Sequence, residues 1–532
     1  MKNKTTAFIN GKVFTLNKNQ PIAEAVLIND NKIINVGTSG QIKYFIDKNT
    51  EIIDLKNKLM IPGFIDCHAH IVIGGLYLLN IDLSKARNSN DFIKQLSNYK
   101  TKNPGKWILG GNWNHQNWES NQLPNKDWID EFSQDTPIFV NRMDYHMGLA
   151  NSCALKLAGI TKYANDPVGG TIVKDRKGEP TGILKDKAMD LIYKIIPIPS
   201  DSEFKNAIKA TLNEAKKFGV TTIHDISDKT HLKYFKYLEN DKMLNCRIYS
   251  RLPIESHNEI IAENLNTQYN TDKLKLGSVK AFADGSLGSS TALFFEPYSD
   301  NLHEYGLAMN ILENGDLKKW SLECDRNKLQ LSIHAIGDKA VSDVIDIIKD
   351  ITKINPKWDR RVRIEHAQHI REEDIKRCKE LDIIVSAQPY HLYDDGCWAL
   401  NKLGYKRLKN SWTFNSFLKS NVKLCFGSDW SVATLNPLMG IYSAVTRQTA
   451  DGLNPIGLIP EEKISIEQAL KCYTLNAAYA AFDEERLGSI EIGKLADLVV
   501  LNEDIFSIEP YEIKDVEIGL TMIDGEIVFN SI

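Results

Sequence analysis

The clearest fold signal in the chain is a run of three segments, LQLSIH (329–334), DKAVSDVIDIIKDIT (338–352) and RVRIEH (361–366). The first and third segments are short and apolar, as buried strands are. The middle segment repeats apolar residues at three- and four-residue steps, as an amphipathic helix does. A strand, a helix and a second strand in this order predict two neighbouring parallel strands joined by a helical crossover.

The same alternation extends in both directions from this unit. Helical stretches such as residues 202–219 and 371–381 separate most of the remaining candidate strands. Eight strands that alternate with helices predict an α/β protein with a (β/α)₈ TIM-like barrel. The six further strands are GFIDCH (63–68), GVTTIHD (219–225), CRIYSR (246–251), GSVKAFA (277–283), DIIVSA (382–387) and VKLCFG (422–427).

Both ends of the chain have a different pattern, with short strands joined by tight turns. AFINGKVFTL (7–16) places Asn10–Gly11 between two apolar arms, which predicts a β-hairpin, and Asp30–Asn31 and Asp524–Gly525 predict two more. Neither end has enough strands to bury a sheet face alone. We therefore expect residues 1–61 and 485–532 to form one composite β-sandwich domain.

One segment interrupts the alternation. Residues 72–200, approximately, contain more than one helix and are rich in aromatic and turn residues, as in GGNWNHQNW (110–118). We expect an inserted subdomain here, after the first barrel strand and over the mouth of the barrel. The barrel domain as a whole would then span residues 62–484.

Composition excludes several classes of protein. The 532 residues are 42% apolar and 25% charged, as in soluble globular proteins, and the formal net charge of −4 gives no sign of a nucleic-acid partner. The longest uncharged apolar window, residues 67–81, is shorter than the roughly 20 residues of a membrane span. Eight scattered cysteines without a C-x-x-C pair, and a start without an apolar leader, predict a cytoplasmic protein.

Histidines stand at the ends of the candidate strands. His68 and His70 are two residues apart, so on a strand both side chains project to the same face. His334 and His366 close two other strands, and Asp429 follows the last one. Each alone is better explained by a core or loop position. Because the carboxyl ends of barrel strands converge, the five together predict a metal site.

Lys280 lies near the end of another candidate strand. A protonated ammonium would be repelled by divalent cations, and burial lowers a lysine pKa from about 10.4. A neutral amine can take up carbon dioxide as a carbamate, whose two oxygens are able to bridge two metals. The alternative roles are a salt bridge to Asp284 or the orientation of substrate.

Six motifs in order resemble the metal-dependent amidohydrolase superfamily, most closely its branch of N-substituted formamide deformylase-like enzymes. The resemblance covers nearly the whole chain, and residues 141–160 and 180–188 resemble the inserted segments of that branch. The motifs are PGFIDCHAH (62–70), KAFADGSLGSSTA (280–292), IHAIGDKA (333–340), RIEHAQ (363–368), FGSDW (426–430) and GKLADLVVLN (493–502).

The resemblance implies two divalent metal ions, with zinc as the expected metal, on imidazole and oxygen ligands, and the residue spacing leaves manganese, iron and cobalt as alternatives. It also implies that Asp429 acts as general base, while a metal-activated hydroxide attacks an amide-type, non-peptide carbon–nitrogen bond of a small molecule. The implied ligands are His68, His70 and Asp429 for one ion, His334 and His366 for the other, and Lys280, as an N6-carboxylate, between the two.

Three alternatives remain open at this stage. A cyclic-amide or ester hydrolase, or a deaminase, would use the same metals. HAIGD (334–338) lacks the His-x-x-x-Glu arrangement of the deaminase branch, which disfavours deamination. A barrel that had lost catalysis and serves as a scaffold belongs to another class, although all six matching ligand positions are filled here.

The remaining candidates are side chains for substrate and subunit contacts. Trp113, with Trp118, either lines an apolar pocket or packs in the inserted subdomain, and His146 matches a histidine of the inserted segment that contacts substrate. Asp284 and Gln388 follow barrel strands and are further candidates for substrate binding. His224 is either a neighbour of the site or a core residue, and His115, His369 and His391 are interpreted as solvated loop residues. An exposed face of the β domain would be the contact of a homodimer.

Overall fold

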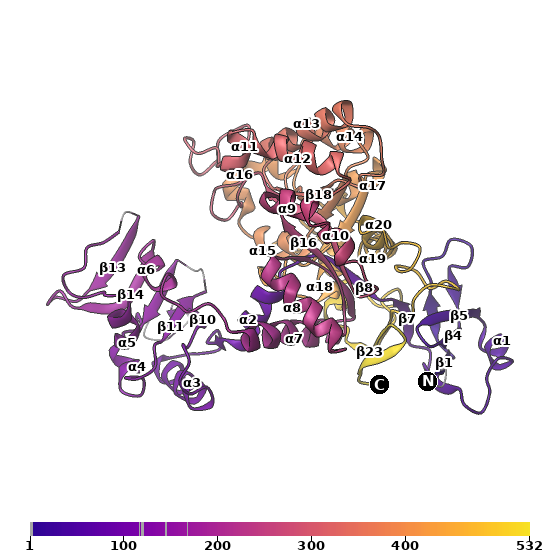
Figure 1. The fold of residues 1–532 in the computed structure, drawn as a ribbon, viewed down its shortest axis with the longest axis horizontal. Coiled ribbons are helices and arrows are strands. Elements are labelled where there is room, and N and C mark those ends of the chain that lie inside the picture. Colours follow the sequence, from indigo (N-terminus) through magenta and orange to yellow (C-terminus); the bar gives the residue numbers. More distant parts are fainter. Residues whose placement is uncertain (1–3, 116–117, 119–121, 144–145, 168) are drawn as a thin grey trace. The chain divides into compact units, whose positions relative to one another are not determined.

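The computed structural model describes residues 4–115, 118, 122–143, 146–167 and 169–532 (Figure 1). The chain divides into two compact units, one of Met1–Val72 with Thr211–Ile532 and one of Ile73–Ala210. Within the described ranges, every helix is too short or too polar to cross a membrane.

The first unit contains a barrel of eight parallel strands, which confirms the predicted fold class. The strands follow one another around the sheet in chain order, and each overlaps one of the eight predicted segments. They are β8 (Phe64–Ala69), β15 (Val220–Ile226), β16 (Arg247–Pro253), β17 (Leu274–Phe282), β18 (Gln330–Ala335), β19 (Arg363–His366), β20 (Ile384–Ala387) and β21 (Lys423–Phe426).

The barrel seam lies between the first strand, β8, and the last, β21. Just beyond β21, the backbone N–H of Asp429 donates to the carbonyl of His68 at 2.6 Å, and the N–H of His70 donates to the carbonyl of Trp430 at 2.6 Å. A Cβ atom at Gly427 would lie 2.5 Å from the backbone nitrogen of His68, so glycine permits this approach. The seam is therefore joined at the level of the expected metal ligands.

Helices alternate with these strands, as the periodicity predicts. In α13 (Asp338–Ile354), the buried residues Val341, Ile345 and Ile348 recur at three- and four-residue steps, which gives the helix one apolar face. The other helices of this alternation are α7 (Asp201–Lys217), α8 (Lys229–Asn240), α9 (His257–Ala262), α10 (Leu265–Gln268), α11 (Asn310–Glu313), α12 (Asp316–Arg326), α14 (Glu372–Glu380), α15 (Pro389–Asp395), α16 (Ala399–Leu408), α17 (Phe414–Lys419), α18 (Pro437–Thr446), α19 (Ile466–Cys472) and α20 (Leu475–Ala480).

Two further sheets in the first unit are built from both ends of the chain. β22 pairs antiparallel with β7, which places strands from the two ends in one sheet. Apolar residues of both sheets share one core cluster, among them Phe8, Val26, Met60, Leu498 and Met522. One sheet has the order β5 (Lys32–Gly37), β4 (Ala25–Asn29), β1 (Thr5–Ile9) and β6 (Glu51–Asp54), with α1 (Ser39–Lys43) after β5. The other has the order β24 (Glu526–Asn530), β23 (Ile518–Ile523), β22 (Leu498–Leu501), β7 (Leu59–Pro62), β2 (Lys12–Phe14) and β3 (Ile22–Ala23).

Two of the three predicted hairpins are confirmed. β4 and β5 turn at Asp30–Asn31, and β23 and β24 turn at Asp524–Gly525. The hairpin predicted at Asn10–Gly11 is wrong, because β1 pairs with β4 and β6 while β2 pairs with β3 and β7 in the other sheet. Asn10, with a φ of 55°, instead redirects the chain from one sheet to the next.

The second unit, Ile73–Ala210, has its own six-stranded sheet and core. Trp113, Trp118 and Phe92 lie in the larger of its apolar clusters. The sheet has the order β13 (Gly170–Lys174), β14 (Pro180–Asp186), β12 (Met147–Ala150), β11 (Phe139–Arg142), β10 (Gly110–Trp113) and β9 (Ile81–Asp82). Its helices are α3 (Ser89–Lys102), α4 (Asp127–Asp130), α5 (Ser152–Leu157) and α6 (Asp190–Tyr193), and α2 (Ile71–Leu79) connects it to β8.

Candidate metal centre

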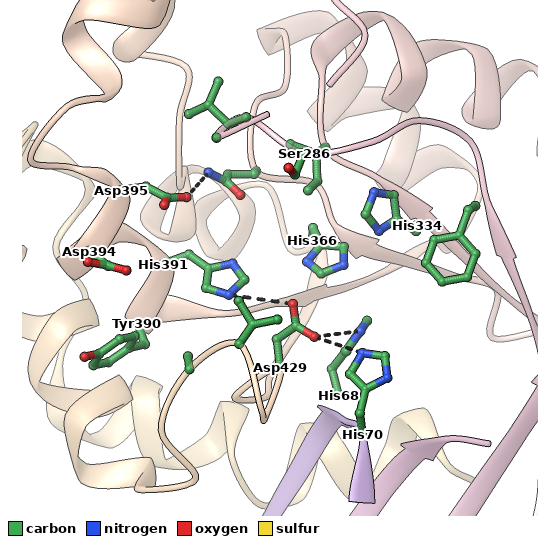
Figure 2. A pocket seen from close by; sticks show the side chains of 17 residues that line it. His68, His70, Ser286, His334, His366, Tyr390, His391, Asp394, Asp395 and Asp429 are labelled. Carbon is green, nitrogen blue, oxygen red and sulfur yellow. Dashed lines mark hydrogen bonds and ion pairs between the residues drawn. The ribbon is translucent and has the colours of Figure 1, made fainter. Parts of the chain in front are cut away.

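A cavity of about 350 Å³ opens where the carboxyl ends of the barrel strands meet (Figure 2). Five of the six expected metal ligands line it, and the sixth, Lys280, is buried beside them. The cavity is lined by His68, His70, Phe282, Ser286, Leu287, Gly288, His334, Ile336, His366, Gln368, Tyr390, His391, Asp394, Asp395, Asp429, Val432 and Ala433.

The carboxylate of Asp429 lies between His391 on one side and His68 and His70 on the other (Figure 2). Its Oδ1 lies 3.5 Å from Nε2 of His68 and 3.3 Å from Nε2 of His70. Its Oδ2 lies 3.7 Å from Nε2 of His391. Burial alone would raise the pKa of Asp429, but the surrounding imidazoles, His68 first among them, and a hydrogen bond from His70 outweigh burial, and the pKa falls well below its ordinary value. Asp429 is therefore a carboxylate at neutral pH.

A buried carboxylate behind His68 fixes the orientation of this ring. Nδ1 of His68 lies 2.5 Å from Oε2 of Glu365, and Oε1 of Glu365 lies 2.9 Å from both Arg251 and Arg363. Burial opposes ionisation of Glu365, but the two guanidinium groups lower its pKa well below the ordinary value. Glu365 is therefore an acceptor, and the proton of a neutral His68 lies on Nδ1.

The position of the proton on His68 shows whether the site fits a metal ion. With its proton on Nδ1, His68 presents the lone pair of Nε2 to a carboxylate oxygen of Asp429 at 3.5 Å. Two electron-pair donors that face each other repel, whereas a cation between them would bind both. Nδ1 of His366 and Nζ of Lys280 are also buried, and neither has a hydrogen-bond partner in the described part of the chain. The donor set of imidazoles and one carboxylate fits a divalent metal.

Burial keeps two of the candidate imidazoles, those of His68 and His366, in the neutral form that binds metal. Burial lowers the pKa of His68 to about 3, although Asp429 and Glu365 oppose the shift. Burial also lowers the pKa of His366 well below its ordinary value, with a further contribution from His334. Both rings therefore remain unprotonated at neutral pH, as metal ligation requires.

Lys280 is an amine that burial has made weakly basic. Burial lowers its pKa to about 7, Glu365 opposes the shift, and Arg251 adds to it. Nζ lies 3.8 Å from the centre of the Phe282 ring. A substantial fraction of Lys280 is thus an unprotonated amine near pH 7, which is the form that reacts with carbon dioxide.

Two of the candidate ligands have left-handed backbone conformations. His366 has a φ of 73° and Asp429 a φ of 61°, and neither is a glycine. Such conformations cost free energy and are found mainly where the surrounding structure enforces them, often at functional sites. In β19, strand alternation places Arg363 and Glu365 on the same face. In a regular strand the next residue, His366, would point to the opposite face. Its left-handed backbone changes that direction, and its ring lines the same cavity as His68.

The ligand atoms fall into two groups that share Asp429. His68, His70 and Asp429 form one group, and His366, His391 and Asp429 form the other, with the ligand atoms of each group within 4.8 Å of one another. His334 is near, with its ring centre 4.5 Å from that of His366. However, Nε2 of His334 lies 3.0 Å from the carbonyl of Gly285.

The two candidate substrate residues that follow barrel strands bind the backbone instead. The Oδ2 of Asp284 accepts hydrogen bonds from the N–H groups of Leu293 and Gly337, and its Oδ1 accepts one from Ile336. Asp284 thereby holds the loops that flank His334. Gln388 is buried outside the cavity lining and donates to the carbonyl of Ser386 at 3.1 Å.

The other two candidate substrate residues lie in the second unit. Trp113 is fully buried in the core of that unit, and its Nε1 donates to the carbonyl of Val140 at 3.0 Å. This is the packing role that was its alternative. Nδ1 of His146 lies 2.9 Å from Oδ1 of Asp186, on a well-exposed part of the same unit.

Sequence reasoning missed several polar residues at the site. The interpretation of His391 and His369 as solvated loop residues is wrong, because His391 lines the cavity and His369 is buried with Nδ1 2.7 Å from Oγ of Ser411. His224, an undecided candidate, is buried with Nδ1 2.9 Å from Arg363. Gln368 lines the cavity two residues beyond His366, within the quoted motif RIEHAQ.

Comparisons with known proteins agree with this geometry. The model of the amidohydrolase family matches residues 51–529. Protein LONG AFTER FAR-RED 3 from Arabidopsis thaliana is 39% identical over 93% of this chain and 86% of its own. N-substituted formamide deformylase from Arthrobacter pascens is 25% identical over 97% of each chain. A crystal structure of an uncharacterized metal-dependent hydrolase from Pyrococcus furiosus is 28% identical, with a TM-score of 0.79 over 95% of this chain and 100% of its own.

The barrel, its cluster of imidazoles around one carboxylate and these matches define a metal-dependent hydrolase. The chain belongs to the amidohydrolase family. The resemblance found in the sequence motifs is thereby confirmed.

Proposed function

We propose that the protein hydrolyses a non-peptide, amide-type carbon–nitrogen bond of a small molecule. The observation that supports this most directly is the position of Asp429, an ionised carboxylate whose two oxygens face three imidazoles, two at the end of β8 and one in α15. Such a carboxylate is suited to binding a cation and to moving a proton at the same site.

Two divalent ions, with zinc as the proposed metal, would be bound here. When bound, they supply Lewis-acid polarisation of a carbonyl group and lower the pKa of a water molecule towards neutrality. Lys280, in the carboxylated form proposed for it, would lie between them. The residues that would hold the ions are His68, His70 and Asp429 for one, and His334 and His366 for the other.

Asp429 would carry the proton in the reaction. As a carboxylate it accepts a proton from the attacking water, and as a carboxylic acid it returns that proton to the departing nitrogen. An amine leaves poorly unless it is protonated, so the same group serves both steps. Glu365 would hold the His68 ring in place throughout, because it pairs with Nδ1 at 2.5 Å.

The assignment of an amide-type carbon–nitrogen bond is supported by a relative. One relative along nearly the full chain is named N-substituted formamide deformylase, a name that denotes cleavage of a formamide. A panel of N-substituted formamides, other open-chain amides, cyclic amides, esters and aminopyrimidines tests the proposal, with detection of released amine, acid and ammonia. Release of amine from open-chain amides is the expected result. Turnover confined to esters, cyclic amides or ammonia-releasing substrates would assign the site to one of the alternatives.

Asp429→Asn tests the catalytic role separately. We expect the variant to retain bound metal and to lose turnover by about 10²- to 10⁴-fold, the usual contribution of a general acid–base group. Elemental analysis and steady-state kinetics on the same preparation measure the two effects. Turnover close to that of the wild type would show that Asp429 is not the base. Wild-type protein without stoichiometric metal would favour a scaffold.

A further inference from the structure

His391 is a polar residue of the pocket that none of the proposed roles uses. It lies in the first turn of α15, directly after barrel strand β20, and it lines the cavity. Its Nε2 is buried, has no hydrogen-bond partner among the residues that the structure describes, and faces Oδ2 of Asp429 at 3.7 Å (Figure 2). This nitrogen thus faces a carboxylate that also faces two other imidazoles.

The distances around Asp429 are similar for all three imidazoles. Nε2 of His70 and of His68 lie 3.3 and 3.5 Å from Oδ1, and Nε2 of His391 lies 3.7 Å from Oδ2. Ligand atoms about 2 Å from a shared zinc ion are separated by about 3 to 4 Å. The distance from Nε2 of His391 to Oδ2 of Asp429 is therefore similar to the distance from Nε2 of His68 to Oδ1.

His366 completes a second group on that side of the carboxylate. The ligand atoms of His366, His391 and Asp429 lie within 4.8 Å of one another, and the two rings are nearly parallel, at an angle of 10° and a centroid distance of 6.1 Å. Nδ1 of His366 also has no hydrogen-bond partner within the described ranges of the chain. Two imidazoles and a carboxylate suit zinc and leave coordination positions for substrate.

His334, the other histidine expected on this side, has a different environment. Its Nε2 lies 3.0 Å from the carbonyl oxygen of Gly285 and 3.4 Å from Oδ1 of Asp284. A nitrogen that faces two acceptors serves as a donor, so Nε2 of His334, a ligand of this ion in the proposed function, donates to these oxygens in this structure. His391 therefore presents Nε2 to Asp429, whereas Nε2 of His334 faces Gly285 and Asp284.

We propose that His391 is a ligand of the second divalent ion, together with His366 and Asp429. The inference rests on the metal dependence stated in the proposed function. It adds a ligand that follows β20 (Ile384–Ala387), the one strand between β17 and β21 to which no ligand was assigned. The ligand class is a borderline-soft divalent cation such as Zn²⁺.

Titration of metal-free protein with Zn²⁺ against a chromophoric chelator tests the proposal. The wild type is expected to bind two ions. In His391→Asn we expect one ion at wild-type affinity and the other weakened by more than about 100-fold, beyond the 10- to 100-fold typical of a residue that only orients a ligand. The matched control is His303→Asn, because His303 is an exposed histidine of the same unit and its loss should leave both affinities unchanged.

The outcomes separate this inference from the proposed function. Wild-type affinities for both ions in His391→Asn, or a single ion in the wild type, would overturn the inference and leave a metal-dependent hydrolase. Wild-type protein that binds no Zn²⁺ would overturn both. Circular dichroism checks that the variant is folded. Anomalous scattering from Zn²⁺-loaded wild-type crystals needs no variant: a peak about 2.0–2.1 Å from Nε2 of His391 is expected, and peaks bonded only to other residues contradict the proposal.

Discussion

Glu365 is a buried carboxylate that contacts three other buried side chains, those of Arg251, Arg363 and His68. It lies 2.9 Å from both Arg251 and Arg363 and 2.5 Å from Nδ1 of His68, and all four side chains are buried. Loss of one partner from a buried ionic cluster leaves the others uncompensated, which usually costs several kcal/mol. This residue therefore links the stability of the barrel to the geometry of the metal centre.

We predict that Glu365→Gln lowers the free energy of unfolding by about 3–5 kcal/mol. It should also weaken Zn²⁺ binding by about 10- to 100-fold, because the amide no longer fixes the proton of His68 on Nδ1. Urea denaturation and chelator competition measure the two effects. Glu372→Gln, a change at an exposed glutamate of α14, is the control. Unchanged metal affinity in a folded Glu365→Gln would show that the carboxylate does not orient His68.

The residues of the site were predictable from the sequence to different degrees. His68, His334 and His366 end buried strands, and strand ends of a barrel converge, so the chain itself indicates their meeting. His391 could not be placed in this way, because it lies on a helix after its strand, where the loop conformation decides its direction. A signal existed nonetheless: QPYH (388–391) follows the strand DIIVSA without a gap, and proline favours the first turn of a helix.

At the scale of elements, the junction between β21 and β8 is where the barrel seam meets the metal centre. Gly427 has no positive φ, so its role is steric: a Cβ would lie 2.5 Å from the backbone nitrogen of His68 and 2.8 Å from Oδ1 of Asp66. That Asp66 oxygen accepts hydrogen bonds from the N–H groups of His68 and Ser428. A methyl group here has no flexible neighbour to displace.

We predict that Gly427→Ala destabilises the protein by about 1–3 kcal/mol, the usual range for an inserted group in a packed core. It should also weaken metal binding, because the shift needed to relieve the contact moves His68. The comparison is Gly40→Ala in α1, where the nearest neighbour of a Cβ is 3.9 Å away and stability should be kept or raised. Equal stability of the two variants would show that the backbone at Gly427 does not lie as close to His68 as the structure has it.

The strands themselves were predictable because their pattern is local. A buried strand reads as a short apolar run, and each of the eight predicted runs overlaps an observed strand. The failed hairpin at Asn10–Gly11 had the same local signal as the correct one at Asp524–Gly525. Pairing depends on partners far along the chain, such as β7 for β2, and a two-residue turn signal does not contain that information.

Arg247 joins the barrel to a hairpin of the terminal sheets. From β16 it donates to Oδ1 of Asp524 at 2.8 Å and to both carboxylate oxygens of Asp497 at 2.9 and 3.0 Å. Burial would raise the pKa of Asp524, but Arg247 and a hydrogen bond from Asn31 outweigh burial and lower it. A carboxyl group with a lowered folded-state pKa stabilises the fold above its unfolded pKa, and this contribution is lost as the pH falls through the folded pKa.

We therefore predict a pH-dependent effect of Asp524→Asn. The variant should be less stable than the wild type by a constant amount from pH 7 to about 5, and the difference should shrink below about pH 4, near the unfolded pKa of aspartate. Urea unfolding at pH 7, 5, 4 and 3 measures the difference. Asp241→Asn, at an exposed position, should show little difference at any pH. If the difference in unfolding free energy between the wild type and Asp524→Asn is unchanged at pH 3, Asp524 and Arg247 do not form an ionised pair.

At the scale of the whole molecule, the candidate ligands are confined to one of the two compact units. His68, His70, His366, His391 and Asp429 all belong to the unit of Met1–Val72 and Thr211–Ile532. They come from opposite ends of this unit's sequence, so an ion that binds them favours the folded barrel over the unfolded chain. By mass action the gain is about 2.7 kcal/mol at a free metal concentration 100 times the Kd.

We predict that this gain is local to the first unit. In hydrogen–deuterium exchange, Zn²⁺ added to metal-free protein should slow exchange in peptides from β8, β19 and β21, whose ends carry or flank the ligands. Exchange in the core strands of the Ile73–Ala210 unit, such as β11 and β12, should change little, because the described candidate ligands lie outside it. Ca²⁺ at the same concentration is the control, since it prefers oxygen ligands to imidazole. Equal protection of both units by Zn²⁺ would mean that the ion stabilises more than the barrel, and no protection in β8 would mean that His68 and His70 are not ligands.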